Sequence, residues 1–179
     1  MNSFFIICYS IISFTILISL TFYVIKQISN TQELEGNIKK LQVSLKQRPS
    51  SYADLYKLGQ LYLRKKLFNK ALLVFREALT IWDKNDKIGV GTLSNTIGFT
   101  YFKLKKYQFA IYYYRVAITI LPDYLLALKN LAFIYESINS FENASQCYKK
   151  CLVLNPTNNF FATRLQLIQR QIDLQPFIS

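Results

Sequence analysis

Apolar and small residues recur at helical steps of three and four through the middle of the chain, and the pattern occurs three times. The second copy consists of Ile97, Gly98, Tyr101, Ala110, Tyr114, Ala117 and Pro122. The first consists of Leu58, Gly59, Tyr62, Ala71, Phe75 and Ala78, and the third of Leu131, Ala132, Tyr135, Ala144, Tyr148, Cys151 and Pro156. Because residues three or four apart share one face of a helix, each copy predicts two antiparallel helices.

The spacing also predicts how the two helices of each pair touch. The eighth position of each copy is small, as in Gly98, so that the backbones can approach, and the twenty-fourth is large, as in Tyr114, to fill the space opposite. The predicted helices cover 52–64 with 68–82, 92–104 with 107–121, 125–138 with 141–154, and a last helix over 159–173. That last helix is half polar, which suits the open end of a stack of repeats.

This arrangement resembles the tetratricopeptide repeat (TPR) family, whose unit of about 34 residues carries L-G-x2-Y, A-x3-F, A and P at fixed offsets. Gly98 and Ala132 lie one such period apart, while about five extra residues separate the first two copies. The chain departs from the family pattern at the fourth position of each copy, where the family favours tryptophan and this chain has Leu55, Ser94 and Leu128, and at Asp83, which replaces the first proline. The resemblance implies an all-α TPR solenoid with repeats at 52–85, 91–124 and 125–158 and a capping helix at 159–173.

Residues 4–25 form a run without a charged side chain, about 33 Å long as a helix and so sufficient for a hydrocarbon core of about 30 Å. No lysine or arginine precedes the run and no small-x-small cleavage site follows it, which favours an uncleaved transmembrane anchor over 1–25 rather than a signal peptide. Positive charge follows at Lys26, Lys39 and Lys40, so the rest of the chain is expected on the side of synthesis.

A polar segment over 26–51 carries a narrow apolar stripe, and we interpret it as an amphipathic stalk or an extra packing helix. The stripe consists of Leu34, Ile38, Leu41 and Leu45. Pro49, Ser50 and Ser51 are expected to break this helix before the first repeat.

Composition narrows the chemistry that the chain can perform. The net charge of +12 favours a negatively charged surface or partner, and the absence of histidine removes the commonest general base and metal ligand. Cys147 and Cys151 are four residues apart on one predicted helix and fit no disulfide or zinc framework. No nucleophile, acid pair or phosphate loop has supporting spacing, so the chain is predicted to be a non-enzyme without a cofactor or metal.

The resemblance implies a partner-binding groove on the concave surface made by the first helix of each repeat. The positions that face this groove in TPR proteins hold Tyr56, Gln60, Leu63, Asn95, Phe99, Phe102, Lys129, Phe133 and Glu136. An aromatic floor with a mixed polar rim suits an apolar peptide or helix; the alternative is that some of these rings bury against the stalk or the cap. The lysines, asparagines and arginine of a chaperone-docking carboxylate clamp are replaced by Tyr56, Gln60, Thr96, Leu126 and Asn130.

Basic residues also cluster at two of the turns between paired helices and are expected to share one edge of the solenoid. This basic edge comprises Arg64, Lys65, Lys66, Lys103, Lys105 and Lys106. It suits anionic lipid headgroups or an acidic partner, with a solvated turn as the plain alternative. RNA binding is disfavoured because aromatic and basic residues are not interleaved as in nucleic-acid modules.

One N-terminal anchor followed by three repeats resembles a family of small plastid-encoded and cyanobacterial thylakoid TPR proteins implicated in photosystem I assembly. The resemblance implies a single-pass thylakoid protein with its repeats in the stroma and photosystem I subunits or assembly factors as partners. Heavy use of Ile, Asn, Lys, Phe and Tyr accords with an AT-rich organelle genome. The same architecture also suits a membrane-anchored targeting receptor or a scaffold on the cytoplasmic face of a bacterial inner membrane.

Overall fold

The protein, described from a computed structural model over residues 2–47 and 51–174, forms eight helices and no strand within those ranges. They are α1 (Asn2–Gln47), α2 (Tyr52–Arg64), α3 (Phe68–Ile81), α4 (Lys87–Lys103), α5 (Tyr107–Ile120), α6 (Leu125–Ser137), α7 (Phe141–Leu154) and α8 (Asn159–Leu174). The chain divides into two compact units, Met1–Arg48 and Pro49–Ser179. The all-α class predicted from the sequence is confirmed.

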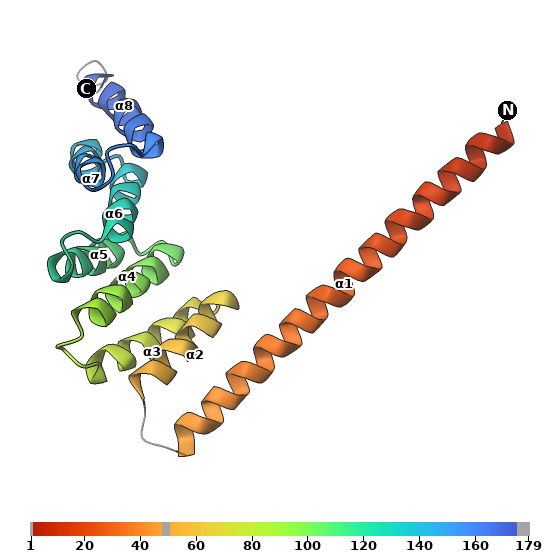
Figure 1. The fold of residues 1–179 in the computed structure, drawn as a ribbon, viewed down its shortest axis with the longest axis horizontal. Helices are drawn as coiled ribbons and strands as arrows, with labels where there is room; N and C mark the ends of the chain where they lie inside the picture. The colour runs from red at the N-terminus through yellow and green to blue at the C-terminus, as the bar shows by residue number, and fades with distance from the viewer. Residues whose placement is uncertain (1, 48–50, 175–179) are drawn as a thin grey trace. The chain divides into compact units, whose positions relative to one another are not determined.

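Helix α1 is continuous through the change from apolar to polar sequence (Figure 1). Within the described residues it is the one helix that is long and apolar enough to cross a membrane. The hydroxyls of Thr15 and Thr21 donate to the carbonyls of Ile12 and Ile18, each at 2.8 Å, so they are satisfied inside the helix. The predicted break at Pro49 and Ser50 and the side chain of Cys8 lie outside the described residues.

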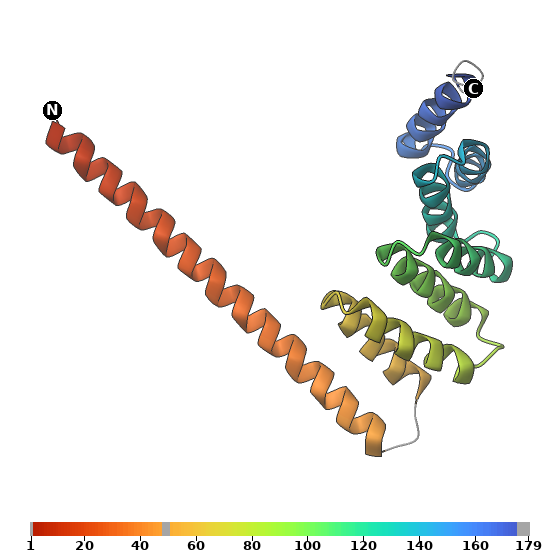
Figure 2. The same ribbon diagram turned by 180° about the vertical axis from the view of Figure 1, so that it is seen from behind.

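Helices α2 to α8 form successive antiparallel hairpins (Figures 1 and 2). The pairs are α2 with α3, α4 with α5, and α6 with α7; α3 also packs on α4, α5 on α6, and α7 on α8. Ala110 and Ala117 are fully buried and Tyr114 is 1% exposed, so the face predicted from the repeat pattern is the core. A Cβ added to Gly98 would lie 2.8 Å from Tyr114 Cδ1, which explains the need for a small residue there.

The turn inside each hairpin closes in the same way. Residues with positive φ end the first helices at Lys66, Lys105 and Asn139, with φ of 58°, 58° and 57°. The amide of the next residue then bonds back to the carbonyl of the repeat's tyrosine, as in Leu67 N to Tyr62 O at 2.8 Å. This left-handed closure satisfies helix-end carbonyls.

The connection between the first two hairpins differs from the prediction, because α4 begins at Lys87 rather than at residue 92. Asp86 is the N-cap: its carboxylate accepts from the amide of Gly89 at 2.8 Å and from the indole of Trp82 at 3.0 Å. The extra residues therefore extend α4 at its start instead of lengthening the loop. In the same helix Ser94 is fully buried, with its hydroxyl donating to the carbonyl of Val90 at 2.8 Å.

Candidate functional site

The centre of the predicted groove is an aromatic surface on α4 and α6. Phe99 is 36% exposed and Phe133 is 46% exposed, and the half-buried ring of Phe102 meets Phe133 edge-on with centroids 5.7 Å apart. The ammonium of Lys103 lies 5.1 Å from the Phe99 centroid and 6.0 Å from that of Phe102. The structure thus brings Phe102 and Phe133 into contact and places the cation of Lys103 over the rings of Phe99 and Phe102, where it is attracted to the ring faces.

The first repeat contributes less open surface to this groove. The ring of Tyr56 lies 5.8 Å from the rings of both Phe75 and Trp82, so it packs largely on its own hairpin. Gln60 and Leu63 are half-buried. The first repeat therefore offers less open aromatic surface than the second and third.

Two polar residues at groove positions are engaged within the solenoid. Asn95 is 6% exposed, and its side-chain oxygen accepts from the amide of Asn130 at 3.1 Å, which ties α4 to α6. Glu136 accepts from the hydroxyl of Tyr148 at 3.1 Å and forms an ion pair with Arg164 of α8. Glu136, which the resemblance assigns to a groove position, therefore links α6 to α7 and to α8.

A pocket of about 660 Å³ continues the aromatic surface between α6 and α8. It is lined by Tyr124, Leu125, Leu126, Lys129, Asn130, Phe133, Tyr148, Asn158, Phe160 and Phe161. Lys129 and Phe133 were predicted groove residues, whereas Phe160, 52% exposed, was not. The volume of this pocket lies in the range of about 300–1,000 Å³ that is typical of ligand-binding clefts.

The structure places the basic edge at the ends of α2 and α4. Arg64, Lys66, Lys105 and Lys106 are exposed, and Lys65 is half-exposed. Lys66 and Lys105 adopt a left-handed conformation that a non-glycine side chain rarely takes. Lys103 lies over the aromatic surface as well, so the groove and the basic edge meet at this residue.

The cysteines are poor candidates for chemistry. Cys147 and Cys151 are buried free thiols, and burial raises the pKa of each to about 11, so both are protonated at neutral pH. In the described part of the chain no group of three or more His, Cys, Asp or Glu side chains could hold a metal ion.

Solved structures support this description of the fold. The chain superposes on the crystal structure of MamA with a TM-score of 0.72 and 22% identity, covering 82% of this chain and 83% of that one. It also superposes on the first TPR domain of Spaghetti (RPAP3), solved with the HSP90 peptide SRMEEVD, with a TM-score of 0.60 and 20% identity over 68% of this chain and 93% of that one. Identities this low establish the fold alone.

Sequence relatives establish the family. Tetratricopeptide repeat models match residues 51–123 and 126–158. The chain is 35% identical over 153 residues to the ycf37 protein of Guillardia theta, covering 86% of each. It is 27% identical over 154 residues to the chloroplastic TPR domain-containing protein PYG7 of Arabidopsis thaliana, covering 86% of this chain and 51% of that one. The chain therefore belongs to the tetratricopeptide repeat family and, within it, to the ycf37 proteins.

Proposed function

We propose that this chain is a membrane-anchored scaffold whose repeats hold a protein partner during photosystem I assembly at the thylakoid. The observation that carries the proposal is the open aromatic surface of Phe99, Phe102 and Phe133 beside the pocket between α6 and α8. Full burial of an exposed ring is worth roughly 1.5–3 kcal/mol, and covering the exposed part of these rings yields a share of that free energy for each. A partner that covers these rings therefore has a substantial source of affinity.

The surface suits an apolar helix or extended peptide more than an acidic tail. Leu126, Phe133 and Phe160 offer exposed apolar side chains around the pocket, and Lys129 is the one charged residue among its described lining. The chaperone-type clamp is replaced at all of its positions, and the engaged Asn130 is one of the substitutes. We therefore do not transfer the HSP90 peptide of the RPAP3 structure to this chain.

The membrane part of the proposal rests on α1. Its apolar segment is long enough for one crossing, and the lysines that follow favour a repeat domain that stays in the stroma. The plastid location is supported by the ycf37 and chloroplastic relatives. The photosystem I role rests on the resemblance to thylakoid TPR proteins drawn from the sequence.

The basic edge is a secondary contact within the same proposal. Its cations lie at two neighbouring turns, and lysine occupies the two left-handed positions where glycine or asparagine would be less strained. Such an edge suits anionic headgroups or an acidic partner, with an interaction that weakens as salt rises.

The test is affinity purification from detergent-solubilised thylakoids with the double variant Phe99→Ala, Phe133→Ala. We expect the wild type to recover photosystem I subunits or assembly factors and the variant to lose them, with an affinity loss of a hundredfold or more. Phe75→Ala, which truncates a fully buried ring, is the control and should destabilise the fold by about 3–5 kcal/mol.

Three results would contradict the proposal in different ways. If the groove variant melts as badly as Phe75→Ala, the rings are core and the binding surface is wrong. If it melts normally and recovers the same partners, the basic edge becomes the better candidate. Recovery of presequence peptides or RNA in place of photosystem proteins would favour a targeting receptor or an RNA-binding protein.

A further inference from the structure

The surface of α5 carries three neighbouring hollows that share lining residues. Pockets of about 460 Å³ along α5, about 450 Å³ toward α3 and about 170 Å³ toward α7 adjoin one another. The first two share Gln108 and Tyr112, and the first and third share Arg115 and Thr119. We call these three neighbouring hollows together the α5 furrow. They are formed mainly by second helices, whereas the groove described above is formed by first helices and the capping helix.

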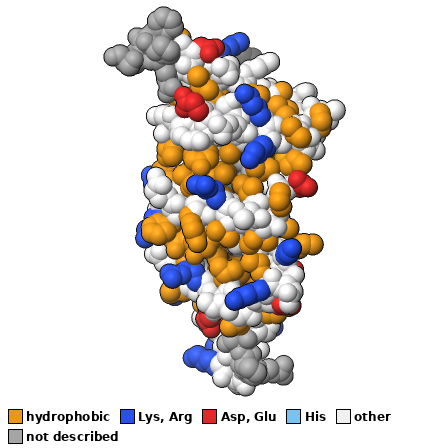
Figure 3. All heavy atoms as spheres, turned by 90° about the vertical axis from the view of Figure 1, so that its left-hand side faces the viewer, with side chains coloured by type: hydrophobic (Ala, Val, Ile, Leu, Met, Phe, Trp, Pro, Cys, Tyr) orange, Lys and Arg blue, Asp and Glu red, His pale blue; other side chains and the backbone are white. Residues whose placement is uncertain are grey.

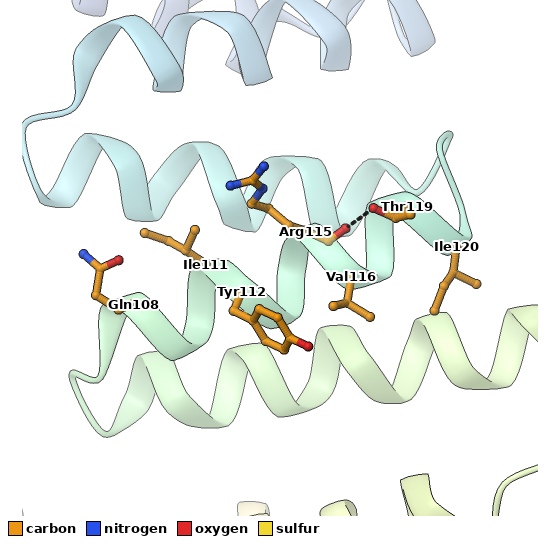
Figure 4. Close-up of a pocket in the computed structure, with 7 residues that line it drawn as sticks. All are labelled: Gln108, Ile111, Tyr112, Arg115, Val116, Thr119 and Ile120. Atoms are coloured by element: carbon orange, nitrogen blue, oxygen red, sulfur yellow. Dashed lines mark hydrogen bonds between the residues drawn. The ribbon is translucent and has the colours of Figure 1, made fainter.

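Figure 4 shows that all residues lining the central hollow come from α5, with Tyr112, Val116 and Ile120 on one side and Ile111 and Arg115 on the other. The buried residues of this helix are Ala110, Ile111, Tyr114 and Ala117, so Ile111 belongs to the core as well as to the lining of the hollow. Tyr112 is exposed and Val116 and Ile120 are half-buried, so these three side chains leave apolar surface open along α5.

An aromatic wall forms the end of the furrow near α3. Tyr101 stacks on Phe109 and Tyr113 with centroids 5.2 Å and 5.5 Å apart, and Tyr112 meets Tyr113 edge-on at 5.1 Å. Phe109 is 56% exposed and Tyr112 is 61% exposed. These rings are held in place by one another while still open to solvent, so a ligand would meet a surface that is already ordered.

Charge in the furrow has one sign. Arg76 lies at the aromatic end, Arg115 at the centre and Lys150 at the α7 end, and no carboxylate is among the described residues that line the hollows. Figure 3 shows the same mixture on one face of the protein, where Lys and Arg side chains are dispersed over a band of hydrophobic ones and Asp and Glu are sparse. A complementary ligand has apolar groups flanked by negative charge.

We propose that the α5 furrow is a second protein-binding surface, which takes an acidic amphipathic segment of a partner. Aliphatic or aromatic side chains of the partner's segment would fill the hollows beside Tyr112 and Val116. Carboxylates of the same segment would pair with Arg76 and Arg115. A protein segment is favoured over a nucleic acid because the rings are stacked on one another and aliphatic side chains line the centre. The scaffold would then hold two partners at once, one on each set of helices.

The test uses the full chain in nanodiscs of neutral phosphatidylcholine and fluorescence anisotropy. The probe is a labelled amphipathic peptide as long as α5, 14 residues, with leucine and phenylalanine on one face and glutamate on the other. The matched control peptide has lysine in place of every glutamate. We expect the acidic peptide to bind and the basic one not to.

Variants of the chain then locate the binding surface. Arg115→Glu and Tyr112→Ala change exposed side chains, so we expect them to weaken binding by about tenfold or more with unchanged melting. The groove variant Phe99→Ala, Phe133→Ala should bind the acidic peptide as the wild type does. The proposal for the α5 furrow and the proposal for the groove are therefore tested independently of each other.

Several results would overturn the assignment. Equal affinity for the two peptides, no binding of the acidic one, or a loss confined to the groove variant would each exclude an acid-binding furrow. Displacement of the peptide by poly(U) through Arg115 would assign the furrow to nucleic acid. A concentration-dependent dimer that Tyr112→Ala dissociates would assign it to a second copy of the chain.

Discussion

Replacing Gly98 with leucine should disrupt the second repeat, because the backbones of α4 and α5 approach too closely there for a side chain. A Cβ at this position would lie 2.8 Å from Tyr114 Cδ1 and 3.2 Å from the carbonyl oxygen of Ala110, whereas carbon atoms in contact are normally about 3.5–4.0 Å apart. Tyr114 is 1% exposed, so its ring is enclosed by neighbouring side chains. Relief therefore requires the hairpin itself to open.

The magnitude follows from two opposing terms. Overpacking costs about 1–3 kcal/mol, and removal of a helical glycine returns roughly 0.5–1 kcal/mol. Because leucine adds further carbons beyond Cβ, we take the upper end of the overpacking cost and expect Gly98→Leu to lower the free energy of unfolding by about 2 kcal/mol. The free energy of unfolding of Gly98→Ala should lie between those of Gly98→Leu and the wild type.

The assay is a urea titration of the full chain followed by tryptophan fluorescence. The single Trp82 lies at the junction of the first two hairpins, with its ring 4.5 Å from that of Tyr52. Gly36→Leu is the matched control, since a Cβ there meets nothing within 4 Å. Equal unfolding midpoints for Gly98→Leu and the wild type would refute the helix register on which the whole account depends.

Three further predictions concern topology, pH and thiol reactivity. Carbonate-washed membranes should retain the chain while protease on the stromal face removes the repeats, and deletion of residues 2–25 should give a soluble folded domain; release by carbonate would refute the anchor. Hydrogen bonds from the amide of Gly89 and the indole of Trp82 hold the pKa of Asp86 below its usual 3.8. The stability that this carboxylate contributes is therefore present above about pH 4 and lost as the pH falls below it. In a plot of the free energy of unfolding against pH, Asp86→Asn should therefore reduce the slope at acid pH. An unchanged slope would exclude this role for Asp86. Burial raises the pKa of Cys147 and Cys151 to about 11, so in a Cys8→Ser background iodoacetamide should label them only on unfolding, and labelling of the native chain at the rate of a free thiol would contradict their burial.

The hairpins were predictable from the sequence because their determinants are local and periodic. Small residues such as Gly98 face large ones such as Tyr114 at fixed separations along the chain. The first helix of each pair ends at a turn with a left-handed residue, which is also a local feature. The early start of α4 was missed, although Asp86 is a good N-cap residue. The repeat period instead predicted that the second repeat begins at residue 91.

The binding surface was only partly predictable because it depends on contacts between repeats. The resemblance to TPR proteins assigned Phe99 and Phe133 to the concave side, but the pairing of Asn95 with Asn130 joins residues 35 apart. The ion pair of Glu136 with Arg164 and the contribution of Phe160 to the pocket depend on where α8 docks. No local pattern specifies these, because they follow from the stacking of one hairpin on the next.

Photocrosslinking from the groove tests the central claim most directly. The chain carrying benzoylphenylalanine in place of Phe133, which is 46% exposed on α6, would be integrated into isolated thylakoids and irradiated. The same probe at Val153, 79% exposed on α7, is the control. The account predicts a crosslink to a photosystem I subunit or assembly factor from position 133 and not from 153; no protein crosslink at 133, or the same products from both positions, would contradict it.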